Sequence, residues 1–213
     1  MRTGSGNRWK LCTGGGLLLI AAALCLVLYN GIESRGAGRQ AAQALEALAQ
    51  QDAAETPETA GTAATLAAYL RDKTMAMPEQ EVDGVAYIGT LELPALELSL
   101  PVASEWSYER LRTAPCRYQG SAYQDTMIIA GHNYQTHFGA LHTLKEGDAV
   151  YFSDLAGSRF FYTVAEIEEL DGQAVEEMEA GDWDLTLFTC TVGGGARVTV
   201  RCEKVWEPIP GEM

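Results

Sequence analysis

Three residues in the C-terminal part of the sequence are of types that together could carry out nucleophilic catalysis. Cys190 ends an apolar segment and stands before three glycines, Gly193–Gly195, and Arg197 follows that turn. His132 follows directly on another apolar segment, 127–131. A thiolate is a nucleophile, an imidazole moves protons near neutral pH, and a guanidinium offers fixed donors to a developing oxyanion. The pattern indicates a cysteine-based acyl-transfer site.

The sequence contains five cysteines, and their surroundings separate Cys190 from the rest. Cys12 and Cys25 lie in an N-terminal apolar run, where a cysteine packs as a small apolar residue. Cys202 alternates with two valines, as a buried structural cysteine does. Outside the apolar run an odd number remains, which indicates a free thiol. A disulfide between Cys116 and Cys202 stays open, although nothing in the sequence brings the two together.

A hairpin across the glycine turn would select Arg197 as the partner of Cys190. Residues directly opposed in such a ladder approach to about 5 Å at Cα, so the guanidinium would reach an acyl group held on the thiol. Arg201 points the same way but lies deeper by roughly 13 Å along the strand. The geometry therefore prefers Arg197 over Arg201.

The three histidines, His132, His137 and His142, lie close together in sequence. A zinc site is disfavoured because residues five apart do not share a helix face and no Cys-x-x-Cys or His-Glu-x-x-His motif accompanies them. We expect His137 and His142 to be surface or loop residues. His132 is favoured as the general acid/base because it stands where a strand turns into a loop.

From Gly84 onward the sequence predicts an all-β domain. Short apolar or alternating segments are separated by Gly, Asp, Asn and Pro, and seven or eight of them predict an antiparallel barrel or sandwich. One short helix is expected near Ser107–Thr113, with Ser104 or Ser107 as its cap. The predicted strands are Tyr87–Leu93, Leu96–Val102, Thr126–Ala130, Ala149–Phe152, Phe160–Ile167, Asp184–Cys190 and Arg197–Val205.

The ordered motifs resemble those of the sortase family. Thr186-Leu187-Phe188-Thr189-Cys190 matches the signature Thr-Leu-x-Thr-Cys, with an arginine on the next strand. Ile129-Ala130-Gly131-His132-Asn133 resembles the family's Gly-His segment, and Ile88–Pro94 resembles its first barrel strand. The resemblance covers roughly Val85 to Trp206, and it rests on the order of these motifs along the chain and on the spacing between them.

The resemblance implies a closed eight-stranded sortase-type β-barrel with short helices and no cofactor or metal. It implies a transpeptidase in which Cys190 is the nucleophile, His132 the general acid/base and Arg197 the oxyanion stabiliser. The substrates would be surface proteins with a C-terminal sorting signal like Leu-Pro-x-Thr-Gly. The acceptor would be an amine of a cell-wall precursor or of a pilin lysine.

Some features limit how far the resemblance extends. The Asp-Pro-Trp or Asp-Pro-Phe lid motif of many pilus-building members is absent, so no subclass is assigned. The turn after Cys190 is short and rich in glycine, so the family's substrate-contacting residues in this turn have no counterparts that we can assign here. For the acidic segment Glu166–Asp184, calcium binding as in part of the family is the alternative, and a solvated acidic face is the preferred interpretation.

Leu11–Tyr29 contains no charged residue and is long enough to cross a bilayer, which needs roughly 20 apolar residues. A cleaved signal peptide would have small residues just after this run, and a lipoprotein signal ending at Cys25 would have a small residue in place of Leu24. The sequence fits neither pattern, so we expect an uncleaved membrane anchor. Arg2, Arg8 and Lys10 predict that the N-terminus stays in the cytoplasm, with the rest of the chain outside.

These observations predict five parts of the chain. They are a cytoplasmic tail at 1–10, a transmembrane anchor at 11–29, a partly helical or disordered stalk at 30–80, a catalytic barrel at 81–207 and a tail at 208–213. The Ala- and Gln-rich stretch Gln40–Asp52 favours a short helix within the stalk.

The net charge of −14 argues against nucleic-acid binding, which needs a basic footprint. Two other cell-wall cysteine enzymes are disfavoured. NlpC/P60 peptidases place Cys before His, and L,D-transpeptidases keep the two residues much closer in sequence. A catalytically idle, membrane-tethered binding barrel remains the alternative from another class, although it would need none of the three candidate residues.

Overall fold

The computed structural model describes residues 5–54, 68–191 and 193–205. The predicted tail at 208–213, the first four residues of the N-terminal tail and residues 55–67 of the predicted stalk lie outside these ranges. The chain divides into two compact units, Met1–Gly36 and Ala37–Met213. The helix α1 (Ser5–Ala54) belongs partly to each.

Within the first unit, the apolar side chains of α1 are exposed. Leu17, Leu18, Leu19 and Ile20 are all more than half exposed, as are most of the large apolar residues that follow up to Ile32. Among the described residues, one helical stretch, Cys12–Gln50, is long and apolar enough by length and composition to cross a membrane. The predicted anchor at 11–29 lies within α1, and its crossing of a membrane stays a prediction.

The second unit is built around a closed barrel of eight strands. The order around the barrel is β2-β3-β4-β5-β8-β9-β7-β6, and β6 pairs back to β2. A further short strand, β1, extends the sheet beside β2. The bounds are β1 Gln80–Val82, β2 Val85–Leu93, β3 Leu98–Ala103, β4 Cys116–Gln119, β5 Met127–Ala130, β6 Ala149–Asp154, β7 Arg159–Asp171, β8 Leu185–Cys190 and β9 Ala196–Val205. The predicted eight-stranded barrel is confirmed.

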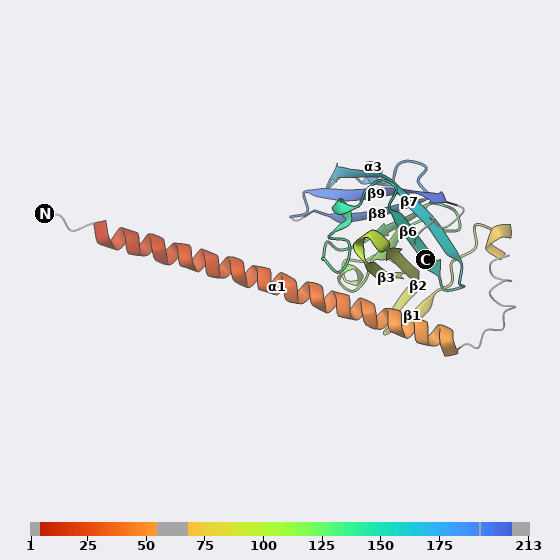
Figure 1. Ribbon diagram of the computed structural model, residues 1–213, viewed down its shortest axis with the longest axis horizontal. Helices are drawn as coiled ribbons and strands as arrows, with labels where there is room; N and C mark the ends of the chain where they lie inside the picture. Colours follow the sequence, from red (N-terminus) through yellow and green to blue (C-terminus); the bar gives the residue numbers. More distant parts are fainter. Residues whose placement is uncertain (1–4, 55–67, 192, 206–213) are drawn as a thin grey trace. The chain divides into compact units, whose positions relative to one another are not determined.

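The expectation that the strands would all be antiparallel is wrong in two places. β3 pairs with β4, and β5 with β8, in parallel. Parallel neighbours need a long connection, and the β5–β8 connection contains β6, β7 and the helix α3 (Val175–Glu179). Figure 1 shows β7, β8 and β9 side by side with α3 next to them.

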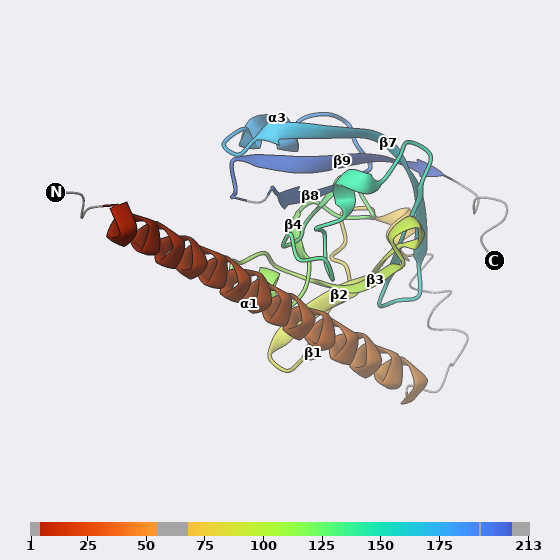
Figure 2. The ribbon, with the colours of Figure 1, turned by 60° about the vertical axis from the view of Figure 1, so that its left-hand side comes forward.

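Each predicted strand has a counterpart, but the ends differ. β7 runs on past the predicted end at Ile167 to Asp171, and β9 pairs with it as far as Ala196. The short strands β1 and β4 were not predicted. The predicted helix at Ser107–Thr113 is a single 3₁₀ turn, Arg110–Arg112. Figure 2 shows the long β7–β9 pair, which lies on the side of the barrel away from β1.

The barrel interior is filled by the apolar side chains of alternating strand positions, as the period-two pattern requires. Ile88, Leu91, Ile129, Leu187 and Val200 are among its fully buried members. Cys202 lies in this interior, whereas Cys116 lies in a separate cluster, and both are free thiols.

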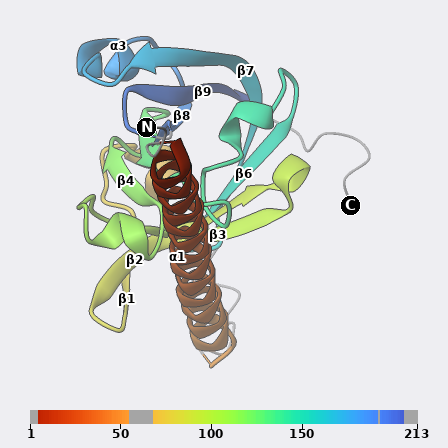
Figure 3. The same cartoon turned by 90° about the vertical axis from the view of Figure 1, so that its left-hand side faces the viewer.

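Two segments cover the outside of the barrel within the second unit. Ala44 and Leu48 of α1 pack with residues of β2, β3 and β4, as parts of one buried cluster. Met178 of α3 packs with Ile128 of β5 and Phe188 of β8 in another. Figure 3 shows α3 on the same side of the barrel as β7, β9 and β8. The second of these covers packs on β5 and β8, the strands that lead to His132 and Cys190.

Candidate active site

The β8–β9 hairpin brings Cys190 and Arg197 to the same rung. Their Cα atoms are direct partners in the ladder, as the hairpin prediction required. Leu185 and Leu187 point into the barrel, so Cys190 belongs to the outward face of β8 together with Thr186 and Phe188. Cys190 is exposed, at the very end of the strand. A thiol in this position is open to a substrate lying over the outer face.

His132 reaches the same edge through the parallel pairing of β5 and β8. Ala130 lies opposite Phe188, and the N–H of Gly131 donates to the Phe188 carbonyl oxygen at 3.0 Å. Two residues beyond this rung, the backbone reaches His132 after β5 and Cys190 at the end of β8. Because neighbouring strands lie about 4.8 Å apart, parallel pairing in this register puts both residues at one edge of the sheet.

The loop that carries His132 is tightly folded. The N–H of Phe138 donates to the His132 carbonyl oxygen at 3.1 Å, and the N–H of Gly139 donates to the Tyr134 carbonyl oxygen at 2.9 Å. A Cβ on Gly131 would lie 2.3 Å from the Phe138 ring, so this position requires glycine. The His132 and Tyr134 rings are stacked, with centroids 3.8 Å apart. The loop therefore fixes the imidazole's backbone and one of its ring faces.

His137, expected as a surface or loop residue, lies in this loop but is fully buried. Its two ring nitrogens have no hydrogen-bond partner among the described residues. Burial lowers its pKa from 6.5 to about 4, the charge of His132 adds to this, and the Ala37 backbone acts in the opposite direction. His142 is exposed at the surface, as expected.

Electrostatics separates Cys190 from the two other cysteines of the barrel domain. Burial raises the pKa of the Cys116 thiol to about 11. Burial also raises the pKa of the Cys202 thiol, far above its ordinary value. Since the thiolate is the reactive form, these two cysteines are inert. Of the three, only Cys190 is exposed.

Arg197 lies over the outer face beside the thiol. Its guanidinium carbon is 6.0 Å from the centre of the Phe188 ring. Its Nη1 is buried and has no hydrogen-bond partner among the described residues. Burial and Glu179 raise the pKa of Tyr118, and Arg197 acts against them. The guanidinium thus lies near the Phe188 ring, and its residue shares a rung with Cys190.

Arg201, on the same face of β9, has a different role. It pairs with Thr186 in the ladder and is almost fully buried. Its Nε donates to the Glu168 carboxylate at 2.7 Å. Its Nη atoms donate to the backbone carbonyl oxygens of Met178 at 2.6 Å and of Glu177 at 2.8 Å. Arg201 thus fastens α3 to the barrel.

A row of aromatic rings extends from the hairpin to the surface, which the sequence did not predict. Phe188 contacts Tyr118 of β4 edge-on at 5.4 Å, Tyr118 contacts Trp106 at 5.9 Å, and Trp106 contacts Tyr108 at 4.9 Å. Trp106 is 37% exposed and Tyr108 80%. The sequence signal was present, since two aromatic residues in the polar stretch 104–110 are unusual, but their neighbours come from distant strands.

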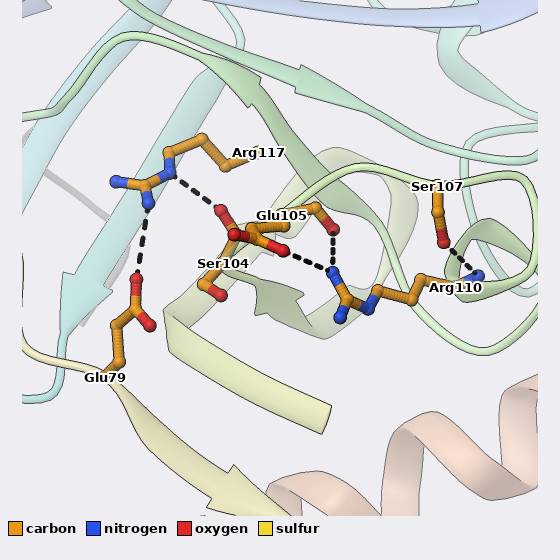
Figure 4. Close-up of polar contacts among 6 residues, drawn as sticks. All are labelled: Glu79, Ser104, Glu105, Ser107, Arg110 and Arg117. Atoms are coloured by element: carbon orange, nitrogen blue, oxygen red, sulfur yellow. Dashed lines mark hydrogen bonds and ion pairs between the residues drawn. The ribbon is translucent and has the colours of Figure 1, made fainter. Parts of the chain in front are cut away.

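Polar contacts hold the loop that carries this aromatic pair (Figure 4). Arg117 of β4 donates from Nε to the Ser104 carbonyl oxygen at 2.9 Å. Arg110 forms an ion pair with Glu105 at 3.0 Å. The Ser107 hydroxyl accepts a hydrogen bond from the Arg110 N–H at 3.1 Å, as expected for a capping serine. The loop is thus tied at both ends.

The acidic segment next to α3 contributes to an open pocket on the outer surface, where Asp125, Glu179, Asp182 and Asp184 lie among its lining residues. The Lys204 side chain forms an ion pair with Asp125, and the backbone N–H of Lys204 donates to the Asp184 carboxylate at 2.7 Å. Among the described residues, no group of three or more His, Cys, Asp or Glu side chains is placed to hold a metal ion.

A comparison with known families decides the identity of this fold. The sequence model of the sortase domain matches residues 91–205, which is more than half of the chain. The chain is a member of the sortase family. The matched region contains β5, β8 and β9, and therefore the edge at which His132, Cys190 and Arg197 are gathered.

Several solved sortases have the same fold. Sortase C1 of Streptococcus agalactiae is 26% identical, with a TM-score of 0.53, over 60% of this chain and 72% of that one. Sortase A of Corynebacterium diphtheriae is 19% identical, with a TM-score of 0.59, over 80% of this chain and 95% of that one. Sortase C of Streptococcus pneumoniae is 18% identical, with a TM-score of 0.61, over 79% and 99%. The comparison with curated proteins gave no significant match.

Proposed function

We propose that this sortase is a membrane-anchored cysteine transpeptidase. It would cleave a C-terminal sorting signal like Leu-Pro-x-Thr-Gly and join the protein to an amine. The observation that carries the proposal is the meeting of three strand ends, which bring together Cys190 of β8, Arg197 of β9 and the His132 loop after β5. The family gives the reaction class, and this edge offers the residue types that the reaction needs.

In the first half of the reaction, the Cys190 thiolate attacks the carbonyl carbon of the scissile peptide bond. Arg197 donates to the oxyanion of the tetrahedral intermediate, a contribution that can reach about 3 kcal/mol. The C–N bond then breaks, and protonated His132 gives its proton to the departing amine. The products are a thioacyl enzyme and the C-terminal fragment.

In the second half, an incoming amine attacks the thioester. His132, now neutral, takes the proton from that amine, the C–S bond breaks and the thiolate is regenerated. Each cycle exchanges one amide for another and consumes no cofactor.

We place the donor peptide at the ends of β5 and β8, where Cys190 is exposed. Deeper on the outer face of these strands, Ile128, Ala130 and Phe188 are at most 7% exposed and pack against Met178 of α3. The row of rings from Phe188 through Tyr118 to Trp106 leads from there to the surface, and apolar side chains of the peptide would contact its exposed end.

We further propose a single-pass arrangement in the cell membrane, with the N-terminus in the cytoplasm and the barrel outside. The apolar helix and the cations before it support this orientation. The partners would be surface proteins that carry the sorting signal, and an acceptor amine from a cell-wall precursor or a pilin lysine.

The test uses the full chain in detergent micelles, incubated with a library of sorting-signal peptides with and without a short glycine peptide as the amine. We expect a thioester on Cys190, detected by mass spectrometry of the intact protein, and a transpeptidation product when the amine is present. Cys190→Ala should form neither, and His132→Gln and Arg197→Ala should slow both. Turnover that survives Cys190→Ala, or an unmodified thiol with every peptide, would overturn the proposal.

A further inference from the structure

The part of α1 that lies in the second unit has a buried face. Ala37, Ala41, Ala44 and Leu48 are each at most 5% exposed. Their spacing of four, three and four residues places them on one side of a helix. Ala41 belongs to the same apolar cluster as Phe138 of the His132 loop, and Ala44 and Leu48 to the cluster around Tyr87. This segment, Ala37–Leu48, is therefore packed into the catalytic domain.

The closest approach in this packing lies at Gly38. A Cβ at this position would lie 2.9 Å from the Cγ2 atom of Thr136 and 3.0 Å from its Cβ. Such distances mean that the helix and the loop touch with no room for a side chain at position 38. Next to this contact, the backbone of Ala37 is close enough to affect the buried ring of His137. Two successive residues of the helix thus contact two successive residues of the loop.

The contacted loop transmits any displacement to His132. Thr136 stands between Tyr134, whose ring is stacked on His132, and Phe138, whose N–H is bonded to the His132 carbonyl oxygen. The Tyr134 ring also lies 5.6 Å from that of His137. These hydrogen bonds and packed rings connect the residues on both sides of Thr136 to His132, so we expect a shift of the loop at Thr136 to move the imidazole.

From these contacts we infer that Ala37–Leu48 positions the general acid/base, with Gly38 and Thr136 as the positioning residues. The inference rests on the proposed function for the role of His132, but the contact itself does not depend on that role. The helix serves as a rigid backing for the His132 loop. A chain without this backing would retain the thiol and Arg197 on the β8–β9 hairpin while losing the placement of the imidazole.

The test enlarges position 38 stepwise in the full chain in detergent micelles. Gly38→Ala and Gly38→Leu are compared with Gly36→Ala and Gly36→Leu, because a Cβ on Gly36 would meet nothing within 4 Å. We expect kcat to fall about threefold for Gly38→Ala and at least tenfold for Gly38→Leu, with KM for the peptide changed less than threefold. The two Gly36 variants should keep the parent kcat.

A second measurement does not need turnover. The sequence has three histidines, so a histidine-labelled protein gives three imidazole signals in an NMR spectrum, and His132→Gln assigns the one from the loop. We expect Gly38→Leu to shift the His132 signal and Gly36→Leu to leave it in place. If no peptide is turned over by the parent protein, the proposed function fails, while this spectrum still decides the contact.

A smaller side chain at Thr136 should compensate for the larger side chain at position 38. We expect Thr136→Gly, added to Gly38→Leu, to recover at least half of the lost kcat and to return the His132 signal toward its original position. Should Gly38→Leu fail to fold, Gly38→Ala with the same rescue replaces it. Equal behaviour of the position-36 and position-38 series, in both kcat and the spectrum, would overturn the inference.

Discussion

Cys190, Arg197 and Arg201 illustrate how depth along a strand decides what a side chain does. Arg197 and Arg201 share the outer face of β9, yet only Arg197 is level with the thiol. Arg201 lies four rungs deeper, where carbonyl oxygens of α3 and the Glu168 carboxylate accept its hydrogen bonds. Two identical side chains on one face therefore serve different purposes, because one lies at the edge of the sheet and the other beneath a helix.

Substitution of Arg197 should affect the chemical step. We expect Arg197→Ala to lower kcat about 100-fold, since an oxyanion donor contributes roughly 3 kcal/mol, and to change KM little. Arg197→Lys should recover part of that loss, because it keeps the charge and loses the fork of donors. Steady-state kinetics with a sorting-signal peptide measures both. A larger effect on KM than on kcat would show that Arg197 binds the ground state instead.

The three cysteines of the barrel domain should differ in reactivity. At pH 8 a thiol with the raised pKa of Cys116, about 11, is only about 0.1% thiolate, and Cys116 and Cys202 are buried as well. We expect iodoacetamide to modify Cys190 at least 100-fold faster than either, as measured by peptide mass mapping of the native protein. Comparable rates at Cys190 and Cys116 would contradict the site.

His137 should make the domain less stable in acid. Its pKa is lowered from 6.5 to about 4 on folding, so the unfolded chain binds more protons between these values. Stability is then complete above about pH 6.5 and is lost as the pH falls toward 4, by at most about 3 kcal/mol. Urea unfolding across this pH range measures the loss. His137→Leu should flatten the curve between pH 6.5 and 4, whereas substitution of the exposed His142 should leave it unchanged.

Among the elements, α3 is attached to the barrel by the packing of Met178 and by hydrogen bonds from Arg201 to two of its carbonyl oxygens. Removing Arg201 would leave Glu168 and two backbone carbonyl oxygens of α3 without their donor. We expect Arg201→Met to lower the free energy of unfolding by about 3 kcal/mol, as the loss of a buried ionic partner does. The segment 172–184 should also become sensitive to limited proteolysis.

The matched control for this change is Arg159→Met on the barrel surface. Arg159 and Glu92 also form an ion pair at 2.9 Å, but both are partly exposed. We expect a loss below about 1 kcal/mol, because water and salt screen such pairs. If both substitutions cost the same in urea unfolding, Arg201 does not hold α3 in the way described.

The loop that carries Trp106 and Tyr108 should contribute to peptide binding. Its rings lead from the buried Phe188 to the solvent. We expect Trp106→Ala to raise KM for the peptide about 2- to 10-fold, with kcat nearly unchanged, since aromatic contacts of this kind contribute about 0.5–1.5 kcal/mol. Leu70→Ala, at another large exposed apolar residue, is the control and should leave both constants unchanged.

At the scale of the whole molecule, the β8–β9 hairpin was the most predictable part. The alternation of Val198, Val200 and Cys202 and the glycine turn specify its register from neighbouring residues alone. The fold class follows from the motifs in the same way. His132 could be placed at a strand end, but the pairing of β5 with β8 could not be predicted, because residues far apart in sequence set it.

The remaining parts depend on long-range packing that leaves little trace in the sequence. Ala37, Ala41 and Ala44 resemble the composition of a spacer, yet they are buried because a small-residue face allows close approach. The burial of His137 and the contact of Gly38 with Thr136 depend on the same packing. The predicted limits of the stalk and of the catalytic domain stay predictions.

The position of β9 in the sheet has a consequence for how the protein folds during its synthesis. This strand is the last in chain order among the described residues, but it lies inside the sheet, between β8 and β7, and it carries Arg197. The barrel cannot close until this segment has emerged, and the most distant pairings are the slowest to form. A chain whose β9 segment is still being synthesised would therefore hold Cys190 without Arg197 beside it, so the candidate site is completed only when the last described strand joins the sheet.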